Sequence, residues 1–532
     1  MSGIGDQRPK RKAVRKSVSA KSQRADQYKA AKSTPTKAEG GKKQTTGSGN
    51  RASATGSGRK GHTADTRRTS HPAQSRHSQR QPGRMPSART TGHNKGSGVR
   101  TRRLAASVLA RVERDDSWAT PILDEALTQT DLDGRDKAFV SNLVFSTIRM
   151  QGTLDAVLNQ VLHTPIDQLD PQVRATLRVG TWELLAGHAP DHAVVKSHVD
   201  AIAKASKSRH FVGFTNGVLR GVIRQRQDFD WLGATTFPHD RAMAFGLGYP
   251  LWVVEFARER FGDRAQRVLE ASNTPAPTIL RAIGSVDALL NDMHDAGIEV
   301  TAHQHIPGAL VVRTRGRGGD LPWVQQGRAV IQDAASQAVV LAAVDAMNAG
   351  DRAVDLCAAP GGKTIALAQH DVAVQANDLH DFRLQRLRDM ADQFGLTIPI
   401  TVGDARTFTP EGGLVDLVLL DAPCSGLGVM RRRPEIRWRQ QPDDITGLAT
   451  LQGELFDAAV RMVKPGGKLV YSVCTWTTAE TDDVVRTALT RHPNVSVQGV
   501  PIDVGTNTEF GVQLAPDTDE TDGMYIAVFR VE

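Results

Sequence analysis

The stretch that decides the fold is Val-Asp-Leu-Val-Leu-Leu-Asp-Ala-Pro-Cys, residues 415–424. Five of its first six residues are apolar, a pattern typical of a parallel strand that is buried on both faces. Asp421 and Cys424 come at the end of that strand, so it ends in side chains that can take part in chemistry. In an open α/β sheet, ligands bind at the carboxyl ends of the strands. We therefore expect a functional site at this end of the sheet.

Apolar runs of the same kind recur on both sides of this stretch, with helical segments between them. This alternation predicts a doubly wound parallel sheet. A final apolar run, Met524–Val531, predicts an antiparallel strand at the edge of that sheet. In this interpretation, residues 329–532 form one α/β domain. Its predicted parallel strands cover residues 353–356, 372–377, 398–402, 417–420 and 468–473.

The first predicted strand runs into Asp-Leu-Cys-Ala-Ala-Pro-Gly-Gly-Lys-Thr, residues 355–364. Small residues let a ligand approach the backbone closely, and the helix that follows offers free N–H groups at its start. The last three residues are like the end of a phosphate-binding P-loop. That motif needs a glycine five residues before Gly362, and Cys357 stands there instead. The run therefore predicts a ligand-binding loop that is not a P-loop.

Two acidic residues close the second and third predicted strands, Asp378 and Asp404. In a dinucleotide-type site, an acid after the second strand accepts hydrogen bonds from ribose hydroxyls. Asp404 would suit the amino group of a base. Either residue alone is more often a helix cap or a solvated turn. Their placement at successive strand ends favours a role in binding a ligand.

Cys424 and Cys474 each end an apolar strand, so we expect both thiols to face one pocket. Covalent chemistry, a metal site and a redox pair are the possible uses of two thiols. Neither cysteine belongs to a Cys-x-x-Cys or Cys-x-x-His pair, which argues against a metal and against the usual redox spacing. Packed core cysteines are the plainest alternative. Pro423, Ser425 and Gly426 argue against it, because they mark a loop.

Together, these motifs resemble those of the Sun-type (Fmu-type) RNA cytosine-C5 methyltransferases, which use S-adenosylmethionine. Residues 355–364 look like the cofactor loop of that family. Leu-Leu-Asp-Ala-Pro-Cys-Ser-Gly-Leu-Gly, residues 419–428, and Tyr-Ser-Val-Cys, residues 471–474, look like its two cysteine motifs. Gln-Asp-Ala-Ala-Ser-Gln at 332–337 resembles the segment that introduces the domain, and Asp-Gly-Met-Tyr at 522–525 resembles its last strand.

The resemblance continues upstream, where apolar residues recur at helical spacing. Residues 173–178, 182–185 and 213–220 look like the helical domain of the antitermination factor NusB. That combination is typical of the small-subunit ribosomal RNA methyltransferase branch, called RsmB. The chain is thus expected to be multidomain, with a catalytic domain that is Rossmann-like. The predicted parts are a disordered basic tail (1–98), an all-α NusB-like RNA-binding domain (99–230), a small α/β linking module (231–328) and the methyltransferase domain (329–532).

The resemblance also implies roles for individual residues. Cys474 would be the nucleophile that attacks C6 of cytosine, and Asp421 would stabilise charge near N3 of the ring. Cys424 would assist removal of the C5 proton and release of Cys474. No metal is expected. The residues expected to bind S-adenosylmethionine are Cys357, Ala358, Ala359, Pro360, Gly361, Gly362, Lys363, Asp378, Asp404 and Asp421.

The chain departs from the family pattern at a few positions. Thr475 follows the second cysteine where the family often has Ser, and residues 480–482 read Glu-Thr-Asp where it often has Glu-Asn-Glu. Residues 280–283 read Leu-Arg-Ala-Ile where the family prefers Leu-Arg-Val-Asn. These changes leave the expected catalytic residues in place.

Basic residues are distributed very unevenly. Residues 1–98 hold 23 of the 67 Lys and Arg but 4 of the 58 Asp and Glu, so they carry +19 and the rest of the chain −10. Few large apolar residues occur there, which predicts disorder and salt-sensitive affinity for nucleic acid; a solubilising extension is the alternative. A second basic segment, Arg-Arg-Arg-Pro-Glu-Ile-Arg-Trp-Arg at 431–439, predicts phosphate contacts and base stacking, or else an exposed charged loop.

The partner and location follow from the same features. No apolar run is long enough to span a membrane, the N-terminus has no apolar signal region, and three cysteines suit a reducing compartment. We expect a cytoplasmic monomer that acts on RNA, most simply 16S ribosomal RNA. The alternatives are a tRNA methyltransferase, a non-catalytic ribosome-assembly factor, a NusB-like transcription partner and an enzyme that methylates an exocyclic amino group. A reversed assignment of the two cysteines, as in DNA cytosine methyltransferases, is a further alternative.

Overall fold

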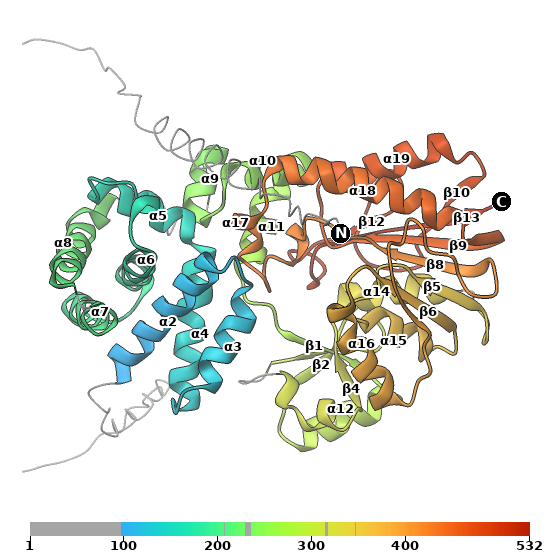
Figure 1. The fold of residues 1–532 in the computed structure, drawn as a ribbon, viewed down its shortest axis with the longest axis horizontal. Coiled ribbons are helices and arrows are strands. Elements are labelled where there is room, and N and C mark those ends of the chain that lie inside the picture. The colour runs from blue at the N-terminus through green and yellow to red at the C-terminus, as the bar shows by residue number, and fades with distance from the viewer. Residues whose placement is uncertain (1–96, 207, 229–235, 314–317, 346) are drawn as a thin grey trace, which may run out of the picture. The chain divides into compact units, whose positions relative to one another are not determined.

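The computed structural model describes residues 97–206, 208–228, 236–313, 318–345 and 347–532. The predicted basic tail, residues 1–98, lies almost wholly outside the described residues. The described chain consists of an all-α part, a small antiparallel sheet with helices, and an α/β part built on a larger sheet (Figure 1). The predicted fold class is confirmed.

The all-α part is built around α6 (Pro171–Ala186), most of whose residues are buried. Asp170 caps this helix by accepting hydrogen bonds from the backbone N–H groups of Gln172 and Val173, with Pro171 at the first helical position. Leu177 of α6 packs in a cluster with Leu219. Around α6 lie α2 (Ser97–Arg114), α4 (Gly134–Arg149), α5 (Gln151–Val161), α7 (Asp191–Ala205) and α8 (Arg209–Gln225), while α3 (Ala119–Thr128) packs against α2 and α4.

A second group of helices follows, α9 (Asp240–Leu247), α10 (Leu251–Phe261) and α11 (Ala265–Asn273). The spacing of apolar residues predicts a single helix over residues 250–272. The chain instead breaks at Gly262, whose φ of +55° is a left-handed conformation that favours glycine. This prediction was wrong because it did not take account of the glycine between two apolar stretches.

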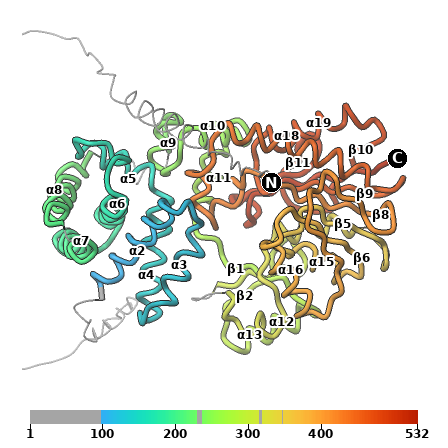
Figure 2. The backbone as a smooth tube through the Cα atoms, viewed as in Figure 1, coloured from blue at the N-terminus to red at the C-terminus, as the bar shows by residue number. Residues whose placement is uncertain are grey.

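The small sheet has the strand order β2-β3-β1-β4 and is antiparallel throughout. Helices α12 (Val286–Asp295) and α13 (Pro322–Gln325) lie beside it (Figure 2). Its last strand, at 329–331, lies just beyond the boundary at residue 328 that we predicted for this module. The strands are β1 (Thr278–Ala282), β2 (Val300–Ala302), β3 (Ala309–Val312) and β4 (Ala329–Ile331).

The larger sheet has the order β11-β12-β13-β9-β8-β5-β6-β7, and β10 pairs with β13. Strands β9, β8, β5, β6 and β7 are parallel to their neighbours in this series, as predicted. Their bounds are β5 (Arg352–Asp355), β6 (Ala373–Asp378), β7 (Ile400–Val402), β8 (Val415–Asp421) and β9 (Val463–Val473). The order of strands reverses at β5, which lies between β6 and β8. Ligand sites in such sheets lie at this switch point.

The last strand, β13 (Met524–Val531), is antiparallel to β9, as predicted, but it does not lie at the edge. It is flanked by β12 (Val512–Leu514) and β10 (Val495–Gln498), and β11 (Thr506–Asn507) pairs with β12. Almost every residue of β13 is buried for this reason. The predicted edge position was wrong, because these short flanking strands have no strong apolar pattern.

Strand β8 shows why the parallel sheet needs helices on both faces. Val418 and Leu420 belong to one buried cluster, while Leu417 and Leu419 belong to another. Side chains alternate between the faces of a strand, so an unbroken apolar run requires two apolar layers. Helices α18 (Pro442–Val460) and α19 (Asp482–Arg491) cover one face, and α14 (Ala334–Val344), α15 (Gly362–Ala368) and α16 (Asp381–Phe394) cover the other (Figure 1).

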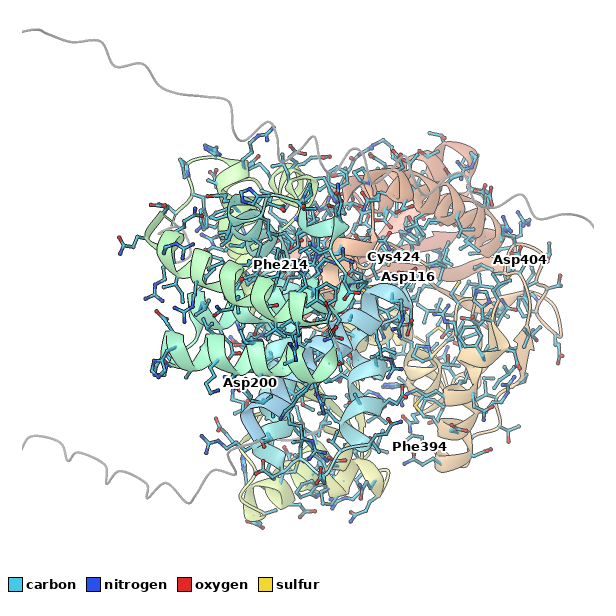
Figure 3. The ribbon with its side chains drawn as sticks, turned by 60° about the vertical axis from the view of Figure 1, so that its left-hand side comes forward. Asp116, Asp200, Phe214, Phe394, Asp404 and Cys424 are labelled. Atoms are coloured by element: carbon cyan, nitrogen blue, oxygen red, sulfur yellow. The ribbon has the colours of Figure 1, made fainter. Side chains whose placement is uncertain are left out.

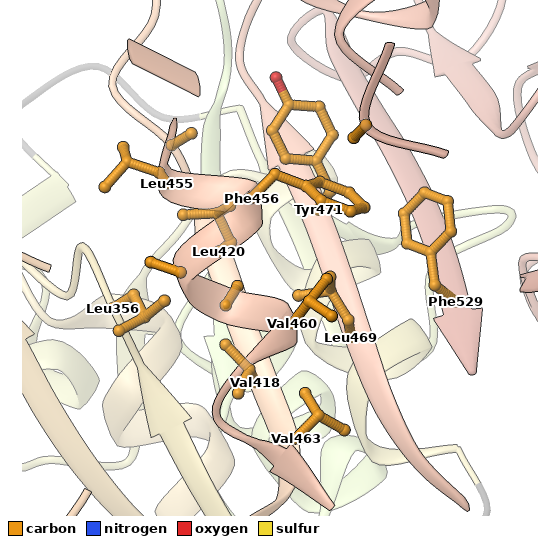
Figure 4. Close-up of a cluster of buried hydrophobic side chains, with 14 of the residues drawn as sticks. Leu356, Val418, Leu420, Leu455, Phe456, Val460, Val463, Leu469, Tyr471 and Phe529 are labelled. Carbon is orange, nitrogen blue, oxygen red and sulfur yellow. The ribbon is translucent and has the colours of Figure 1, made fainter. Parts of the chain in front are cut away.

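The core under α18 is centred on three aromatic rings. Phe456 of α18 meets Tyr471 of β9 and Phe529 of β13 edge to face, with ring centroids 6.1 and 5.2 Å away (Figure 4). This packing holds α18 against β9.

Among the described residues, no helix is both long and apolar enough to cross a membrane.

Candidate active site

Two of the predicted catalytic residues lie at the ends of neighbouring parallel strands. Cys424 follows β8 and Cys474 follows β9, and the pairing of Asp421 with Ser472 carries the two strands in register to their ends. The two Sγ atoms are 3.3 Å apart. Both side chains are partly exposed and neither forms a disulfide. The structure thus brings together the two thiols, as the sequence predicted.

The environment of Cys424 favours its protonated form. The hydrogen bond with Cys474 and burial raise the pKa of the Cys424 thiol well above its usual value. The Cys424 thiol therefore keeps its proton at neutral pH and can donate it toward the Cys474 sulfur.

Asp421 is held on both of its carboxylate oxygens. Ser472 Oγ donates to Oδ1 over 2.7 Å, and Lys363 Nζ donates to Oδ2 over 2.7 Å. Burial works to lower the pKa of Lys363, but the charge of Asp421 and the hydrogen bond with it outweigh this and raise it. Lys363, which the sequence assigned only to cofactor binding, is therefore an ammonium group that contacts the predicted catalytic carboxylate.

Ser472 was missed by the sequence analysis. It is a polar residue within the otherwise apolar run Leu-Val-Tyr-Ser-Val, residues 469–473, and it is wholly buried. A lone hydroxyl in a buried strand needs a partner, and that partner is Asp421. This interruption of the apolar run was the signal that could have identified it.

The loop after β5 has the features of a ligand cradle. Residues 357–362 carry no side chain larger than those of cysteine and proline, and Gly361 has a φ of +105°. A Cβ atom on Gly361 would lie 2.7 Å from Leu387, so only glycine fits there. Asp378 braces the loop, because its Oδ2 accepts from the backbone N–H of Ala359 over 3.1 Å.

Acidic groups surround this loop. Asp355 is buried and accepts a hydrogen bond from Thr364 on one oxygen, while its Oδ1 has no partner in the described protein. Burial raises the pKa of Asp355 to about 7. A partnerless buried acceptor beside small residues fits a ligand with hydroxyl and ammonium donors, and S-adenosylmethionine carries both. The residues of the loop, 357–363, with Asp378 and Asp421, would hold it.

Asp404 is placed differently from the other predicted ligands. Its carboxylate forms an ion pair with Arg406, with a contact of 2.6 Å, and the side chain is about one-third exposed. The hydrogen bond from Arg406 lowers the pKa of Asp404 to about 2. Figure 3 shows Asp404 well apart from Cys424. Contact of Asp404 with a base amino group stays a prediction.

Two of the five arginines in the arginine-rich segment, residues 431–439, are not available to RNA. Arg431 and Arg437 are buried, with exposed fractions of 6% and 0%. Arg437 lies 3.8 Å above the ring of Tyr249 and donates to Asn273 Oδ1, and Trp438 donates from its indole to the carbonyl of Ile148. The predicted phosphate contacts were wrong for Arg431 and Arg437, because the chain encloses both. Arg433 is exposed and Arg432, Trp438 and Arg439 are partly exposed, so contacts of these residues with RNA stay a prediction.

Arg431 and Arg432 instead hold two parts of the catalytic domain together. Arg431 Nε contacts Asp522 Oδ1 at 2.5 Å, and Arg432 spans Asp522 and Asp333 with contacts of 2.8 and 2.6 Å. Asp333 introduces α14 and Asp522 precedes β13. These arginines are thus structural ion-pair partners of the first and last motifs of the domain.

Three family models match the chain. Residues 341–530 match the model described as 16S rRNA methyltransferase RsmB/F. Residues 99–224 match the NusB family, and residues 249–317 match the ferredoxin-like domain of RsmF/B-like methyltransferases. The three matches follow the division into all-α part, small sheet and α/β part.

Known proteins similar to this chain cover most of its length. Rv1407 of Mycobacterium tuberculosis, named as a methyltransferase without a stated substrate, is 35% identical over 81% of this chain and 96% of its own. The ribosomal RNA small subunit methyltransferase B of Vibrio cholerae is 33% identical over 74% of this chain and 89% of its own. The crystal structure of PH0851 has the same fold, with a TM-score of 0.69 and 24% identity over 81% of this chain and 98% of its own. The chain therefore belongs to the RsmB/F family of S-adenosylmethionine-dependent RNA methyltransferases.

Proposed function

We propose that this protein methylates C5 of a cytosine in small-subunit (16S) ribosomal RNA through a transient bond between Cys474 and C6 of the ring. The observation that carries the proposal is the pair of thiols 3.3 Å apart at the ends of β8 and β9. The choice of RNA is supported by the match to the RsmB/F model and by the name of the Vibrio cholerae relative. Because small-subunit ribosomal RNA of this kind is assembled into ribosomal subunits in the cytoplasm, we expect the protein to act there.

The thiol is needed because C5 of cytosine is a poor nucleophile. The Cys474 thiol first gives its proton to solvent, and the thiolate bonds to C6. The electron pair of the C5–C6 double bond then shifts to C4–C5 while N3 takes up a proton, which leaves C5 as the nucleophilic carbon of an enamine. Covalent catalysis of this kind divides one difficult step into two easier ones. S-adenosylmethionine, when bound, supplies the electrophilic methyl group. The target base must leave its stack to reach such a site.

Asp421 and Lys363 would act on the charge that develops at N3. The ammonium group of Lys363 lies 2.7 Å from Asp421, and Ser472 holds the other carboxylate oxygen. Together they can supply a proton and a hydrogen bond to N3 as Cys474 attacks. A fixed pair of this kind stabilises the developing charge without having to reorganise.

Cys424 would complete the reaction. In the free protein its pKa is raised first of all by the hydrogen bond with Cys474. In the proposed step, Cys424 gives up its proton to solvent once the Cys474 sulfur has bonded to C6 and the hydrogen bond between the two thiols is lost. The resulting thiolate accepts the C5 proton, and the electron pair of that C–H bond restores the C5–C6 double bond. Cys474 leaves as a thiolate, and N3 returns its proton to Lys363 and Asp421.

Bisulfite sequencing of ribosomal and transfer RNA tests the proposal. RNA from cells with and without this protein is compared, and purified protein is then added to the unmodified RNA with S-adenosylmethionine. We expect one or a few small-subunit cytosines to become resistant to conversion only when the protein is present. A modified site in transfer RNA alone would contradict the ribosomal assignment, and methylation at an exocyclic amino group would contradict the C5 chemistry.

A further inference from the structure

A buried carboxylate lies behind the two thiols. Glu480 ends the short helix η8 (Thr478–Glu480), just after β9, and its side chain has no exposed surface. Its Oε1 accepts from the backbone N–H of Ser425 over 2.7 Å and from Gln452 Nε2 over 3.2 Å. Its Oε2 accepts from Ser425 Oγ, Thr477 Oγ1 and Thr475 Oγ1 over 2.6, 2.8 and 3.3 Å. One carboxylate thus receives five hydrogen bonds.

The partners of Glu480 belong to both cysteine loops. Ser425 is the residue after Cys424, and Thr475 is the residue after Cys474. The hydroxyl oxygens of Ser425 and Thr475 are themselves 2.8 Å apart. The two backbone segments that carry the thiols are therefore joined through a single side chain.

Gln452 of α18 extends this connection. Besides contacting Glu480, its Nε2 donates to the carbonyl oxygen of Pro423 over 2.8 Å. The loop with Cys424 is thus held by Glu480 on one side of the cysteine and by Gln452 on the other.

The surroundings of the Glu480 carboxylate are unusual because no positively charged side chain pairs with it. In the part of the chain that the structure describes, no Lys, Arg or His forms an ion pair with Glu480. Burying a carboxylate without such a partner is costly unless hydrogen bonds satisfy it. A glutamine would avoid that cost but would offer one acceptor oxygen instead of two. A carboxylate is needed at this position because its two oxygens together accept hydrogen bonds from donors in both cysteine loops.

We propose that Glu480 is a positioning residue that holds Cys424 and Cys474 within reach of each other. The proposal deepens the proposed function and rests on it, because a fixed separation matters only if both thiols act on one base. In Glu480→Gln, an amide nitrogen at the Oε1 position would face the Ser425 N–H and Gln452 Nε2, which cannot accept, and both hydrogen bonds would be lost. At the Oε2 position it would force the hydroxyls of Ser425, Thr475 and Thr477 to turn and accept, so the network changes in either orientation. The two loops would then separate or fluctuate.

The first test measures the thiol separation without RNA. Diamide, a diazene oxidant, takes two electrons and two protons from the thiols and becomes a hydrazine, while the Cys424–Cys474 disulfide forms. The rate is followed in the full-length protein by mass spectrometry of the joined peptides. We expect Glu480→Gln to slow this reaction about tenfold, as the loss of one net hydrogen bond would. The matched control is Glu509→Gln, at an exposed residue that pairs with Arg486, which should leave the rate unchanged.

The second test measures covalent chemistry in the Cys424→Ala background. Adding Glu480→Gln should slow formation of the RNA adduct about tenfold, because Glu480 also holds the loop that carries Cys474, while the affinity for S-adenosylmethionine stays the same. If Cys424→Ala alone forms no adduct, the proposed function fails, and the diamide rates still decide the role of Glu480. If the adduct forms equally fast with and without Glu480→Gln, the positioning role is wrong and the proposed function stands.

Folding is checked separately by thermal unfolding and by binding of S-adenosylmethionine. A folded Glu480→Gln protein that forms the disulfide as fast as the unaltered protein would overturn the proposal. If Glu480→Gln does not fold, the Ser425→Ala and Thr475→Val proteins test the positioning role instead, since each variant removes one side-chain donor from Oε2 of Glu480. We expect each to slow disulfide formation several-fold, and unchanged rates in both would overturn the proposal.

Discussion

Lys363 Nζ lies 2.7 Å from Asp421 Oδ2, and this contact joins the first turn of α15, directly after the loop that follows β5, to the end of β8. This contact links the expected cofactor loop to the carboxylate beside the two thiols. A lysine in this position can act on the target base as well as complete the cradle for the cofactor. Its contribution to catalysis can be separated from its contribution to binding.

We predict that Lys363→Met lowers kcat about a hundredfold, because the site loses the charge that stabilises the attacked ring. Binding of S-adenosylmethionine, measured by calorimetry, should weaken much less. The control is Lys464→Met, which removes an ion pair with Asp416 at a half-exposed lysine. A Lys363→Met protein with full kcat and poor cofactor binding would show that Lys363 serves the cofactor alone.

Gly428 provides a test of the packing beneath the thiols. Its backbone N–H donates to the carbonyl oxygen of Cys474 over 3.0 Å, and its carbonyl accepts from Gly523. A Cβ atom on Gly428 would lie 2.0 Å from the Gly523 oxygen and 2.9 Å from the Cys474 oxygen. We predict that Gly428→Ala lowers the melting temperature and abolishes methyl transfer, because backbone atoms must move away.

The matched control for that variant is Gly447→Ala. Gly447 is exposed within α18, and apart from its chain neighbours and the nearby backbone of the helix itself, no atom lies within 4 Å of an added Cβ. Alanine should stabilise this helix by about 0.5–1 kcal/mol. The same chemical change is therefore expected to have opposite effects at the two positions, and equal melting temperatures for the two variants would contradict the packing described here.

Asp355 predicts a pH dependence of stability. Its pKa is raised by burial to about 7, above an unfolded value of about 4, so the folded state binds more protons between these pH values. The free energy of unfolding should therefore fall as pH rises from about 4 to 7. Asp355→Asn should be more stable than the unaltered protein at pH 8 by about 2–4 kcal/mol, and the difference should shrink at pH 5.

Urea denaturation at pH 5 and pH 8 measures this effect. The asparagine oxygen can still accept the hydrogen bond from Thr364, so the comparison isolates the charge. A stability difference that is the same at both pH values would show that the Asp355 carboxyl group does not titrate in this range.

The arginine-rich segment provides a test of a structural role against an RNA-binding one. We predict that Arg431→Met lowers the free energy of unfolding by about 1–3 kcal/mol, because the buried carboxylates of Asp522 and Asp333 keep Arg432 as an ion-pair partner but lose Arg431. Affinity for RNA should be unchanged in a filter-binding assay on the folded protein. Arg530→Met, at an exposed pair with Glu532, is the control and should change stability little. A large loss of RNA affinity without loss of stability would instead support the prediction from sequence that Arg431 contacts RNA phosphates.

The parallel sheet could be predicted from the sequence because burial on both faces leaves an unmistakable pattern. The run at 415–420 has apolar residues where one-sided strands have polar ones, and the structure places Leu417 and Val418 in different apolar layers. Short strands such as β12 have too few residues for such a pattern. The interior position of β13 therefore became apparent only from the structure.

The chemistry at the strand ends could be predicted for a similar reason. Cys424 and Cys474 close strands that proved to be neighbours, so their meeting follows from topology. The role of Arg437 could not be predicted, because its burial depends on Tyr249 and Asn273, which are far away in the sequence. A charged segment has the same composition whether it is exposed or enclosed.

The most direct test of the central claim is covalent trapping of RNA. Cys424→Ala and Cys474→Ala proteins are incubated with unmodified small-subunit RNA and S-adenosylmethionine, then separated on a denaturing gel. We predict a stable protein–RNA adduct with Cys424→Ala, because Cys474 attaches to C6 and is not released. Cys474→Ala should form no adduct and transfer no methyl group. An adduct formed by Cys474→Ala and absent from Cys424→Ala would contradict the assignment and show that Cys424 is the nucleophile.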